Sequence, residues 1–264
     1  MNKILGALCI IAAAGIAQQL TIQGSTTVLP IAQRAAEVYM DNNPDADITI
    51  RGSGSGTGIA ALIDHSTGIA NSSRPMKAKE LNLARQNGVN PTASIIALDG
   101  IVIIVNPGNG VNDISKADLK NIFSGKVTSW DKVGGKAGTI VVVSRDAASG
   151  TFEVFNEKVL GGTKLTDAAL MLASNQEVAR AVAQTPGAIG YIGIGYASKD
   201  IKPVTVEGIK ATLTSVQDGS YPYSRSLYMY TDGSPSGLAS RYINFILSAD
   251  GQKLVQEEGF VPLP

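Results

Sequence analysis

Cysteine and histidine are almost absent from this 264-residue chain. The single cysteine, Cys9, lies among the first residues, so the remainder can form neither a disulfide nor a thiolate metal site. The single histidine, His65, stands in a polar turn, and the sequence has no Gly-x-Ser-x-Gly motif and no metal-site spacing of histidine, cysteine and carboxylate residues. These shortages argue against a catalytic triad or a metal centre, and the sequence indicates no cofactor.

An excess of charge of either sign is also lacking. The 22 lysines and arginines equal the 22 aspartates and glutamates, which argues against a nucleic-acid partner because such binding depends on a basic surface. A small anion remains possible, because a few N–H dipoles can hold it without excess positive side chains. Hydrophobic residues make up 44% and charged residues 17%, an ordinary globular balance. The length suits one large domain or two lobes of roughly 100–150 residues each.

Long hydrophobic runs are absent after the N-terminal segment. Lys3 precedes an uncharged run, Ile4 to Ala17, in which Gly15 and Ala17 are small residues suited to a cleavage site. We therefore expect residues 1–17 to be a signal peptide and the protein to be exported to the periplasm, the cell surface or the extracellular space. An uncleaved segment would instead tether the protein to the membrane. No later stretch reaches about 20 apolar residues.

Short apolar strands alternate with helical segments, which predicts an α/β fold with parallel sheets. Strands are expected at 20–23, 47–51, 68–71, 93–105, 139–143, 188–196 and 221–231. Helices are expected after residues 27, 58, 76, 115, 151 and 174, and a last helix should pack on the first lobe through Leu238, Tyr242, Phe245 and Ile246. The segments 93–105 and 221–231 would cross between two lobes.

Three turns that join a strand to a helix share one design. Each is rich in glycine and hydroxyl residues: Ser25-Thr26-Thr27, Ser53 with its flanking glycines, and Ser149-Gly150-Thr151. A helix start offers free N–H donors and about half a unit of positive charge, so an oxyanion fits there, and the hydroxyl groups add donors. A single such turn is better explained as a helix N-cap, but three together indicate an anion site.

Arg145 precedes the third of these turns by four residues. Its planar guanidinium can grip two oxygens of a tetrahedral anion. A surface salt bridge with the adjacent Asp146 is the alternative. The following Ser-Gly-Thr helix start favours the anion-binding interpretation.

The sequence resembles the substrate-binding proteins of the ABC-type phosphate uptake system over nearly all of the chain after residue 17. The motifs that carry the resemblance are Gly24 to Pro30, Gly52 to Gly58, Ala70 to Pro75, Ile122 to Lys126, Arg145 to Phe152, Gly187 to Tyr191, and Tyr221-Pro222. The Arg-x3-Ser-Gly-Thr element is the most specific of them. The resemblance implies a two-lobed periplasmic-binding-protein fold of type II (Venus-flytrap). Lobe I would comprise residues 18–98 plus 229–264, lobe II would comprise residues 99–228, and two segments would cross between them.

The resemblance also implies a ligand, a partner and a set of binding residues. The ligand would be inorganic phosphate, the partner the membrane permease of an ABC transporter, and the protein a monomer without enzymatic activity. The implied ligand residues are Ser25, Thr26, Thr27 and Ser53 from lobe I, and Arg145, Ser149, Gly150 and Thr151 from lobe II. Ser73 belongs to the expected set, with Ser72, Arg74 and Asp99 as further candidates.

Ser73 departs from the family pattern. Better-known members have an aspartate there, which accepts the proton of hydrogen phosphate and repels fully deprotonated sulfate. A hydroxyl can donate and accept, so phosphate can still bind, and Asp99 or Asp146 could supply an acceptor instead. Other tetrahedral oxyanions (sulfate, molybdate and tungstate) therefore stay open as ligands. The rival classes are a phosphate-ester hydrolase that uses Ser149 or Ser53, and a cell-surface or signalling module with phosphate as a structural ligand.

Overall fold

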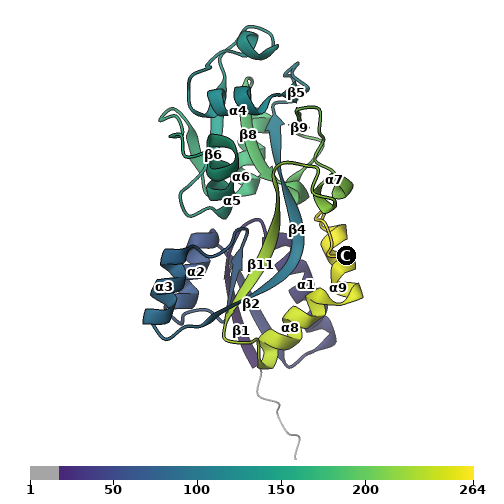
Figure 1. Cartoon of the computed structure of the whole chain (residues 1–264). Helices are drawn as coiled ribbons and strands as arrows, with labels where there is room; N and C mark the ends of the chain where they lie inside the picture. The colour runs from purple at the N-terminus through teal and green to yellow at the C-terminus, as the bar shows by residue number, and fades with distance from the viewer. Residues whose placement is uncertain (1–17) are drawn as a thin grey trace, which may run out of the picture.

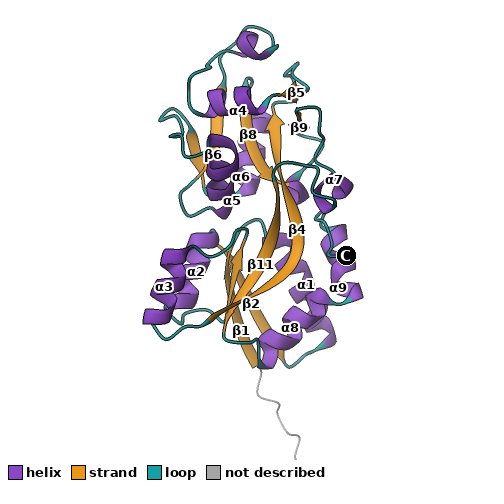
Figure 2. Ribbon diagram, in the orientation of Figure 1, coloured by secondary structure: helices purple, strands orange, loops and turns teal. Residues whose placement is uncertain are grey.

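The computed structural model describes residues 18–264, which form two α/β lobes, one above the other in Figures 1 and 2. This confirms the expected fold class. The expected signal peptide, residues 1–17, lies outside the described residues. From residue 18 onward, no helix combines the length and the apolar character needed to cross a membrane.

Lobe I, the lower lobe in Figure 1, contains the first part of the described chain and its last helices. Its elements are β1 (Gln18–Gly24), α1 (Leu29–Asn42), β2 (Ala46–Gly52), α2 (Ser55–Ile63), β3 (Ile69–Ser72), α3 (Ala78–Gln86), α8 (Gly237–Leu247) and α9 (Ala249–Glu257). β1 lies between β2 and β3 and pairs in parallel with both. Because the carboxyl ends of parallel strands share one edge of a sheet, the turns after β1, β2 and β3 lie together.

Lobe II holds the middle of the chain. Its elements are β5 (Asp113–Ile114), α4 (Lys116–Phe123), η1 (Trp130–Val133), β6 (Val141–Arg145), α5 (Gly150–Phe155), η2 (Asn156–Leu160), β7 (Leu170–Leu172), α6 (Asn175–Gln184), β8 (Ala188–Gly193), η3 (Ile194–Tyr196), β9 (Lys202–Pro203), β10 (Thr205–Val206) and α7 (Leu213–Gln217). β6 pairs in parallel with β7 and β8. The turns after β6 and before α6 are therefore at one edge of this sheet.

Two long strands, β4 (Pro91–Val105) and β11 (Ser224–Asp232), run between the lobes. β4 pairs with β11 as far as Gly100 and then, from Ile101 onward, with β8 of lobe II. The strand order is β2-β1-β3-β11-β4-β8-β6-β7, so one hydrogen-bonded path links both lobes. Near the chain end, Val261 exchanges backbone hydrogen bonds of 2.8 and 3.1 Å with Leu98 of β4.

Each lobe has its own buried core. In lobe I, Tyr242 of α8 packs edge-on against Tyr39 of α1, and its hydroxyl donates to the carbonyl of Ala32 at 2.6 Å. Helix α8 therefore packs on lobe I, as its apolar stripe predicted. In lobe II, Phe155 and Tyr191 stack with ring centroids 3.9 Å apart. Fully burying such side chains contributes about 1.5–3 kcal/mol each.

One expected strand is shorter than the sequence suggested. The strand predicted at 188–196 ends at Gly193 and continues as the short helix η3. The backbone N–H of Ile194 donates to the Asp99 carboxylate at 2.9 Å rather than to a neighbouring strand, and the Tyr196 hydroxyl donates to the carbonyl of Thr26. The Asp99 side chain of β4 thus takes the N–H that would have continued the strand.

Candidate anion-binding site

The helix starts of both lobes face one another at the lobe boundary. From lobe I come the turns after β1, β2 and β3, and from lobe II the turn into α5 and the start of α6. The backbone N–H of Gly56 in α2 donates to the carbonyl of Ala148 in lobe II at 2.9 Å. The predicted turns Ser25-Thr26-Thr27, Ser53 and Ser149-Gly150-Thr151 are therefore brought together.

Two of the predicted serines cap helices. Ser25 Oγ accepts from the backbone N–H groups of Thr27 and Val28 at 3.1 and 3.4 Å. Ser149 Oγ accepts from the N–H of Phe152 at 3.2 Å. A hydroxyl whose oxygen accepts from the backbone keeps its own hydrogen available for donation. Capping and anion binding are therefore compatible roles for Ser25 and Ser149.

Arg145 is almost completely buried at the end of β6, with 1% of its surface exposed. Its Nε donates to the carbonyl of Leu172 at 3.2 Å, and its Nη2 donates to the carbonyl of Ala173 at 2.6 Å and to Thr26 Oγ1 at 3.1 Å. Its Nη1 is buried and has no hydrogen-bond partner within residues 18–264. Burial lowers the pKa of Arg145, but a guanidinium stays charged in proteins. The side chain thus presents one free edge of a fixed cation.

Tyr191 supports Arg145 from the lobe II core. Its hydroxyl accepts the backbone N–H of Arg145 at 3.3 Å and lies 2.8 Å from Ser144 Oγ. Complete burial raises the pKa of Tyr191 to about 12, so the hydroxyl stays neutral and can make both contacts. Arg145 is therefore held by strand, carbonyl and core contacts together.

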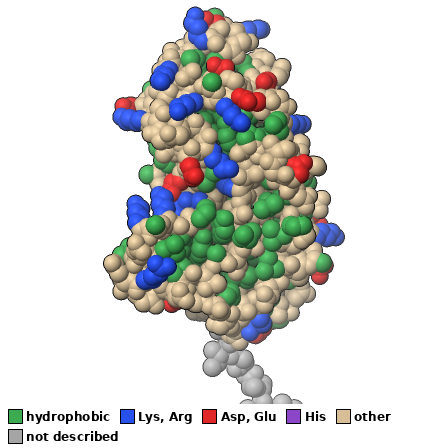
Figure 3. Space-filling model, viewed as in Figure 1, with side chains coloured by type: hydrophobic (Ala, Val, Ile, Leu, Met, Phe, Trp, Pro, Cys, Tyr) green, Lys and Arg blue, Asp and Glu red, His purple; other side chains and the backbone are tan. Residues whose placement is uncertain are grey.

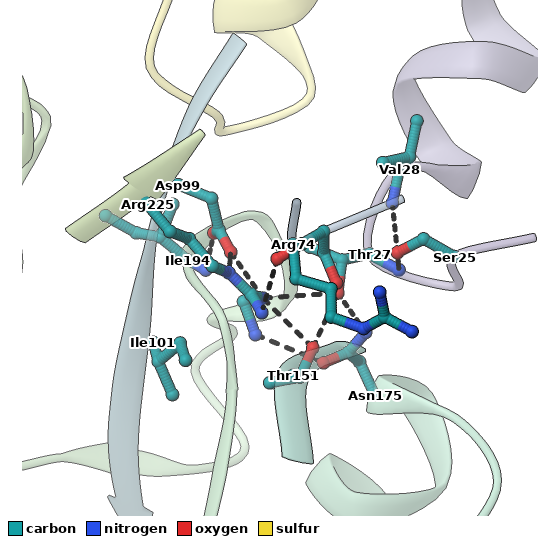
Figure 4. A network of polar contacts seen from close by, with 12 residues as sticks. Ser25, Thr27, Val28, Arg74, Asp99, Ile101, Thr151, Asn175, Ile194 and Arg225 are labelled. Carbon is teal, nitrogen blue, oxygen red and sulfur yellow. Dashed lines mark hydrogen bonds and ion pairs between the residues drawn. The ribbon is translucent and has the colours of Figure 1, made fainter. Parts of the chain in front are cut away.

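Threonine hydroxyls connect the two lobes. Thr27 Oγ1 of lobe I lies 3.0 Å from Thr151 Oγ1 of lobe II. Asn175, the first residue of α6, donates from Nδ2 to Thr26 Oγ1 at 3.2 Å and to Thr27 Oγ1 at 3.0 Å. Figure 4 shows Thr27, Thr151 and Asn175 within one network of polar contacts.

A second buried cation lies beside these threonines. Arg225 of β11 pairs with Asp99 of β4, with N···O distances of 2.7 Å from Nη2 and 2.8 Å from Nε (Figure 4). Its Nη2 also donates to Thr151 Oγ1 at 3.0 Å. Complete burial raises the pKa of Asp99, and the charge of Arg225 opposes that shift. Asp99 thus neutralises Arg225, which leaves Arg145 as the uncompensated cation of this group.

Ser73 and Ser55 form the other side of the site. Ser55 Oγ accepts from the N–H of Ser73 at 3.1 Å and lies 3.3 Å from Ser73 Oγ. A side-chain carbon placed on Gly150 would lie 2.4 Å from Ser55 Oγ and 2.8 Å from Ser73 Oγ, so only glycine allows the lobes to meet here. Ser53 Oγ is also buried, without a hydrogen-bond partner in the described part of the chain.

Two further candidates have local partners. Ser72 Oγ donates to the carbonyl of Arg74 at 2.7 Å. The Arg74 guanidinium donates two 2.7 Å hydrogen bonds to Glu80 and lies 2.5 Å from Glu153 of α5. Burial acts to lower the pKa of Arg74, but the hydrogen bond to Glu80 and the charge of Glu153 outweigh it and raise that pKa. The cation proposed at Arg74 is therefore paired with carboxylates, and the second cation beside the threonines is Arg225.

Three residues of this site were missed by sequence reasoning: Ser55, Asn175 and Arg225. Asn175 directly follows Ser174, after which a helix was expected, so its place at a helix start was readable, but its contact with the threonines of lobe I was not. Arg225 lies directly opposite Asp99 in the pairing of β4 with β11, and this register is not readable from a single sequence. Ser55 lies in the glycine-rich motif Gly52 to Gly58, from which only Ser53 was chosen as a ligand residue.

The described residues offer no candidate metal centre. In residues 18–264, no three histidine, cysteine or carboxylate side chains are grouped so as to hold a metal ion. His65 is exposed after α2, where its Nε2 lies 3.1 Å from the carbonyl of Asn87. The fold and the site define the class as a two-lobed α/β protein whose lobes face each other through helix starts, hydroxyl groups and a buried cation, the donors that a small anion needs.

Comparison with known proteins agrees with this class. Residues 12–250 match the family model described as a PBP superfamily domain. The chain is 36% identical over 249 residues to the phosphate-binding protein PstS of Bacillus subtilis, covering 92% of this chain and 80% of that protein. The chain belongs to the PBP superfamily and, within it, to the PstS family.

Solved structures show the same relationship. A crystal structure from Clostridium perfringens, described as that of a phosphate ABC transporter substrate-binding protein with bound phosphate, matches with a TM-score of 0.87 and 33% identity, covering 94% of this chain and 100% of that chain. An ABC-type phosphate transport receptor from Vibrio cholerae matches with a TM-score of 0.76 and 30% identity, covering 93% and 100% of the two chains.

Proposed function

We propose that this protein captures inorganic phosphate between its two lobes and delivers it to the membrane permease of an ABC transporter. The observation that carries the proposal is the free, buried Nη1 of Arg145 beside the Ser149-Gly150-Thr151 helix start. Membership of the PstS family and the phosphate bound in the C. perfringens structure support the same ligand. The family consists of substrate-binding transport proteins, so the protein is not an enzyme.

The charges around the threonines suit an oxyanion held mainly by dipoles. Arg225 is neutralised by Asp99, so Arg145 supplies the net positive charge. Ser25, Thr26, Ser149 and backbone N–H groups at the helix starts add donors that need no counter-ion. Hydrogen bonds to a charged group are worth roughly 1.5–3 kcal/mol each, so several of them support micromolar or tighter binding.

Capture would proceed by closure of the lobes. β4 and β11 are continuous through the boundary, so a hinge motion in them brings the donors of lobe I toward Arg145 of lobe II. Closing shields the anion from water, which strengthens each hydrogen bond. The closed form would then be recognised by the permease.

Calorimetric titration of ligand-stripped protein tests the ligand. We expect one phosphate to bind per chain and to displace both sulfate and molybdate. Failure of phosphate to displace either anion would refute phosphate in favour of another tetrahedral oxyanion. Ser73 supports that alternative. A carboxylate at this position would be the simplest explanation of selectivity against sulfate, and this chain has a hydroxyl there instead.

Arg145 provides the matching variant. Arg145→Ala should weaken phosphate binding by about a hundredfold or more, because a buried charged partner is worth about 2–5 kcal/mol. Arg145→Lys should recover only part of the loss, because an ammonium lacks the planar fork. Arg180, exposed on α6, is the control, and Arg180→Ala should bind phosphate as the unmodified protein does. Equal binding by Arg145→Ala and Arg180→Ala would contradict the site.

The remaining expectations belong to the same proposal. The protein would act as a monomer outside the cytoplasm, with residues 1–17 as a signal peptide or, if uncleaved, as a membrane tether. The lobes would divide at 98/99 and 228/229. The hydrophobic clusters support a division at 98/99, because Ala97 packs with lobe I and Ile101 with lobe II. On the return strand the change comes earlier than 228/229, because Tyr223 packs with lobe II and Leu227 already packs with lobe I.

A further inference from the structure

Asp99 and Arg225 form a cross-strand pair where the two lobes join. They are directly opposite in the register of β4 and β11, and their side chains are 0% and 4% exposed. The second carboxylate oxygen, Oδ1, accepts from the N–H of Ile194 at 2.9 Å, so the aspartate is fixed from both sides. Arg225 is thus anchored to the strands that belong to neither lobe alone.

From this position Arg225 reaches hydroxyls of both lobes. Its Nη2 donates to Thr151 Oγ1 of lobe II at 3.0 Å and lies 3.4 Å from Thr27 Oγ1 of lobe I (Figure 4). Its Nη1 donates to the backbone carbonyl of Ser73 at 3.3 Å. One side chain therefore contacts the turns that carry three expected ligand residues.

These contacts fix the direction of the hydrogen bond between the threonines. Thr27 Oγ1 receives N–H groups from Asn175 and Arg225, which use both of its lone pairs. Its own hydrogen must then be donated, and Thr151 Oγ1 is 3.0 Å away. Thr151 Oγ1 accepts from Thr27 and Arg225, so its hydrogen is left to donate elsewhere.

We propose that Arg225 is a positioning residue that orders the Thr27–Thr151 hydroxyl chain, so that Thr151 donates to the bound oxyanion when the lobes are together. This inference rests on the proposed phosphate-binding function. Without the N–H of Arg225, Thr151 could rotate its hydroxyl toward Thr27 and present a lone pair to the anion. The Asp99 carboxylate serves to hold Arg225 in place, not to contact the ligand.

A double-mutant cycle with Arg225→Gln and Thr151→Val tests this coupling by calorimetric titration with inorganic phosphate. Each single variant should bind about tenfold more weakly, the value of one hydrogen bond to a charged ligand. If Arg225 acts through Thr151, the combined variant should lose no more than about twofold beyond either single one. An additive loss of about a hundredfold would overturn the inference. Thr151→Ser keeps the hydroxyl. In a protein that carries Thr151→Ser, adding Arg225→Gln should therefore again weaken phosphate binding about tenfold.

Two outcomes separate this inference from the proposed function. Phosphate binding by the unmodified protein together with an additive cycle refutes only the role of Arg225. Absence of phosphate binding by the unmodified protein overturns both. If Arg225→Gln does not fold, the Arg225→Met and Asp99→Leu combination replaces it in the cycle, because an apolar pair substitutes for a buried ion pair at little cost in stability. The same non-additivity with Thr151→Val is expected.

Discussion

Glu153 of α5 and Arg74, which follows β3, form an ion pair across the lobe boundary, with Oε2 and Nε 2.5 Å apart. Lys77 of lobe I lies 2.7 Å from the same carboxylate. The side chains of Arg74 and Glu153 are 4% and 16% exposed, so water screens this pair less than a surface pair. Basic and acidic side chains gather at the level where the lobes meet (Figure 3). This cluster links α5 of lobe II to the segment after β3 of lobe I, outside the ligand network.

The first prediction concerns this ion pair. Glu153→Gln should release phosphate about three- to tenfold faster with little change in association rate, because losing one partner of a shielded charge pair acts mainly on dissociation. Stopped-flow displacement of phosphate measures both rates. Glu157→Gln, one turn further along, is the matched control, since Glu157 is exposed and makes no ion pair in the described residues. An unchanged dissociation rate in Glu153→Gln would show that the pair does not hold the lobes together.

A substitution at Gly150 should change phosphate affinity without lowering the melting temperature, and so it distinguishes an effect on lobe closure from an effect on folding. Gly150→Ala should weaken phosphate binding by about ten- to a hundredfold, because its new carbon would meet Ser55 Oγ at 2.4 Å and overpacking costs about 1–3 kcal/mol. The unliganded protein should melt at the same temperature or higher, because alanine has a higher helix propensity than glycine at the first position of α5. The control is Gly56→Ala in α2, whose new carbon would lie 3.4 Å from the nearest atom. Equal phosphate affinity in the two variants would contradict the closed arrangement.

Ser73 gives a prediction about selectivity. Ser73→Asp should keep phosphate and bind sulfate at least about tenfold more weakly, because a carboxylate accepts the proton of hydrogen phosphate and repels an anion without one. Ser73→Asn, of similar size and uncharged, should not discriminate in this way. Competitive titration of the three proteins with phosphate and sulfate measures the ratio. An unchanged ratio in Ser73→Asp would refute the role assigned to Ser73.

Glu80 gives a pH dependence of stability. Burial acts to raise its pKa, but the hydrogen bonds from Arg74 and from the N–H of Lys77 outweigh it and lower that pKa from the ordinary value of a glutamate. A carboxyl with a depressed folded-state pKa stabilises the fold above its unfolded-state value, and this contribution is lost as the pH falls through the folded-state value. The melting temperature of the unliganded protein should therefore fall below about pH 4.5.

Melting curves between about pH 6 and pH 3 test this dependence. Glu80→Gln should melt at a lower temperature near neutral pH and show a smaller further loss on acidification. Glu37, whose exposed carboxylate lies 3.4 Å from Arg34, is the control, and Glu37→Gln should change the melting temperature little. Parallel curves for Glu80→Gln and the unmodified protein would exclude a stabilising role for the Glu80 carboxylate.

Much of the architecture was readable from local sequence. Apolar alternation and helix-start residues placed β1, β2, β3, β4 and α6 close to their observed bounds, because strand period and capping depend on neighbours within a few residues. The hydroxyl-rich turns were found for the same reason. The strand at 188–196 was overextended, because Asp99, distant in sequence, takes the N–H of Ile194.

The sequence by itself determined the α/β class, the three helix-start turns and Arg145 as the cation beside one of them. Tertiary structure alone decided which groups face one another at the lobe boundary. Three contacts join residues more than 70 positions apart: the ion pair of Asp99 with Arg225, the ion pair of Arg74 with Glu153, and the hydrogen bond from Asn175 to Thr26. Such contacts depend on strand register and lobe closure, which no local pattern encodes. The sequence shows that Arg145 and Arg225 are cations. Only the fold decides that Asp99 neutralises Arg225 and leaves Nη1 of Arg145 without a partner in the described residues.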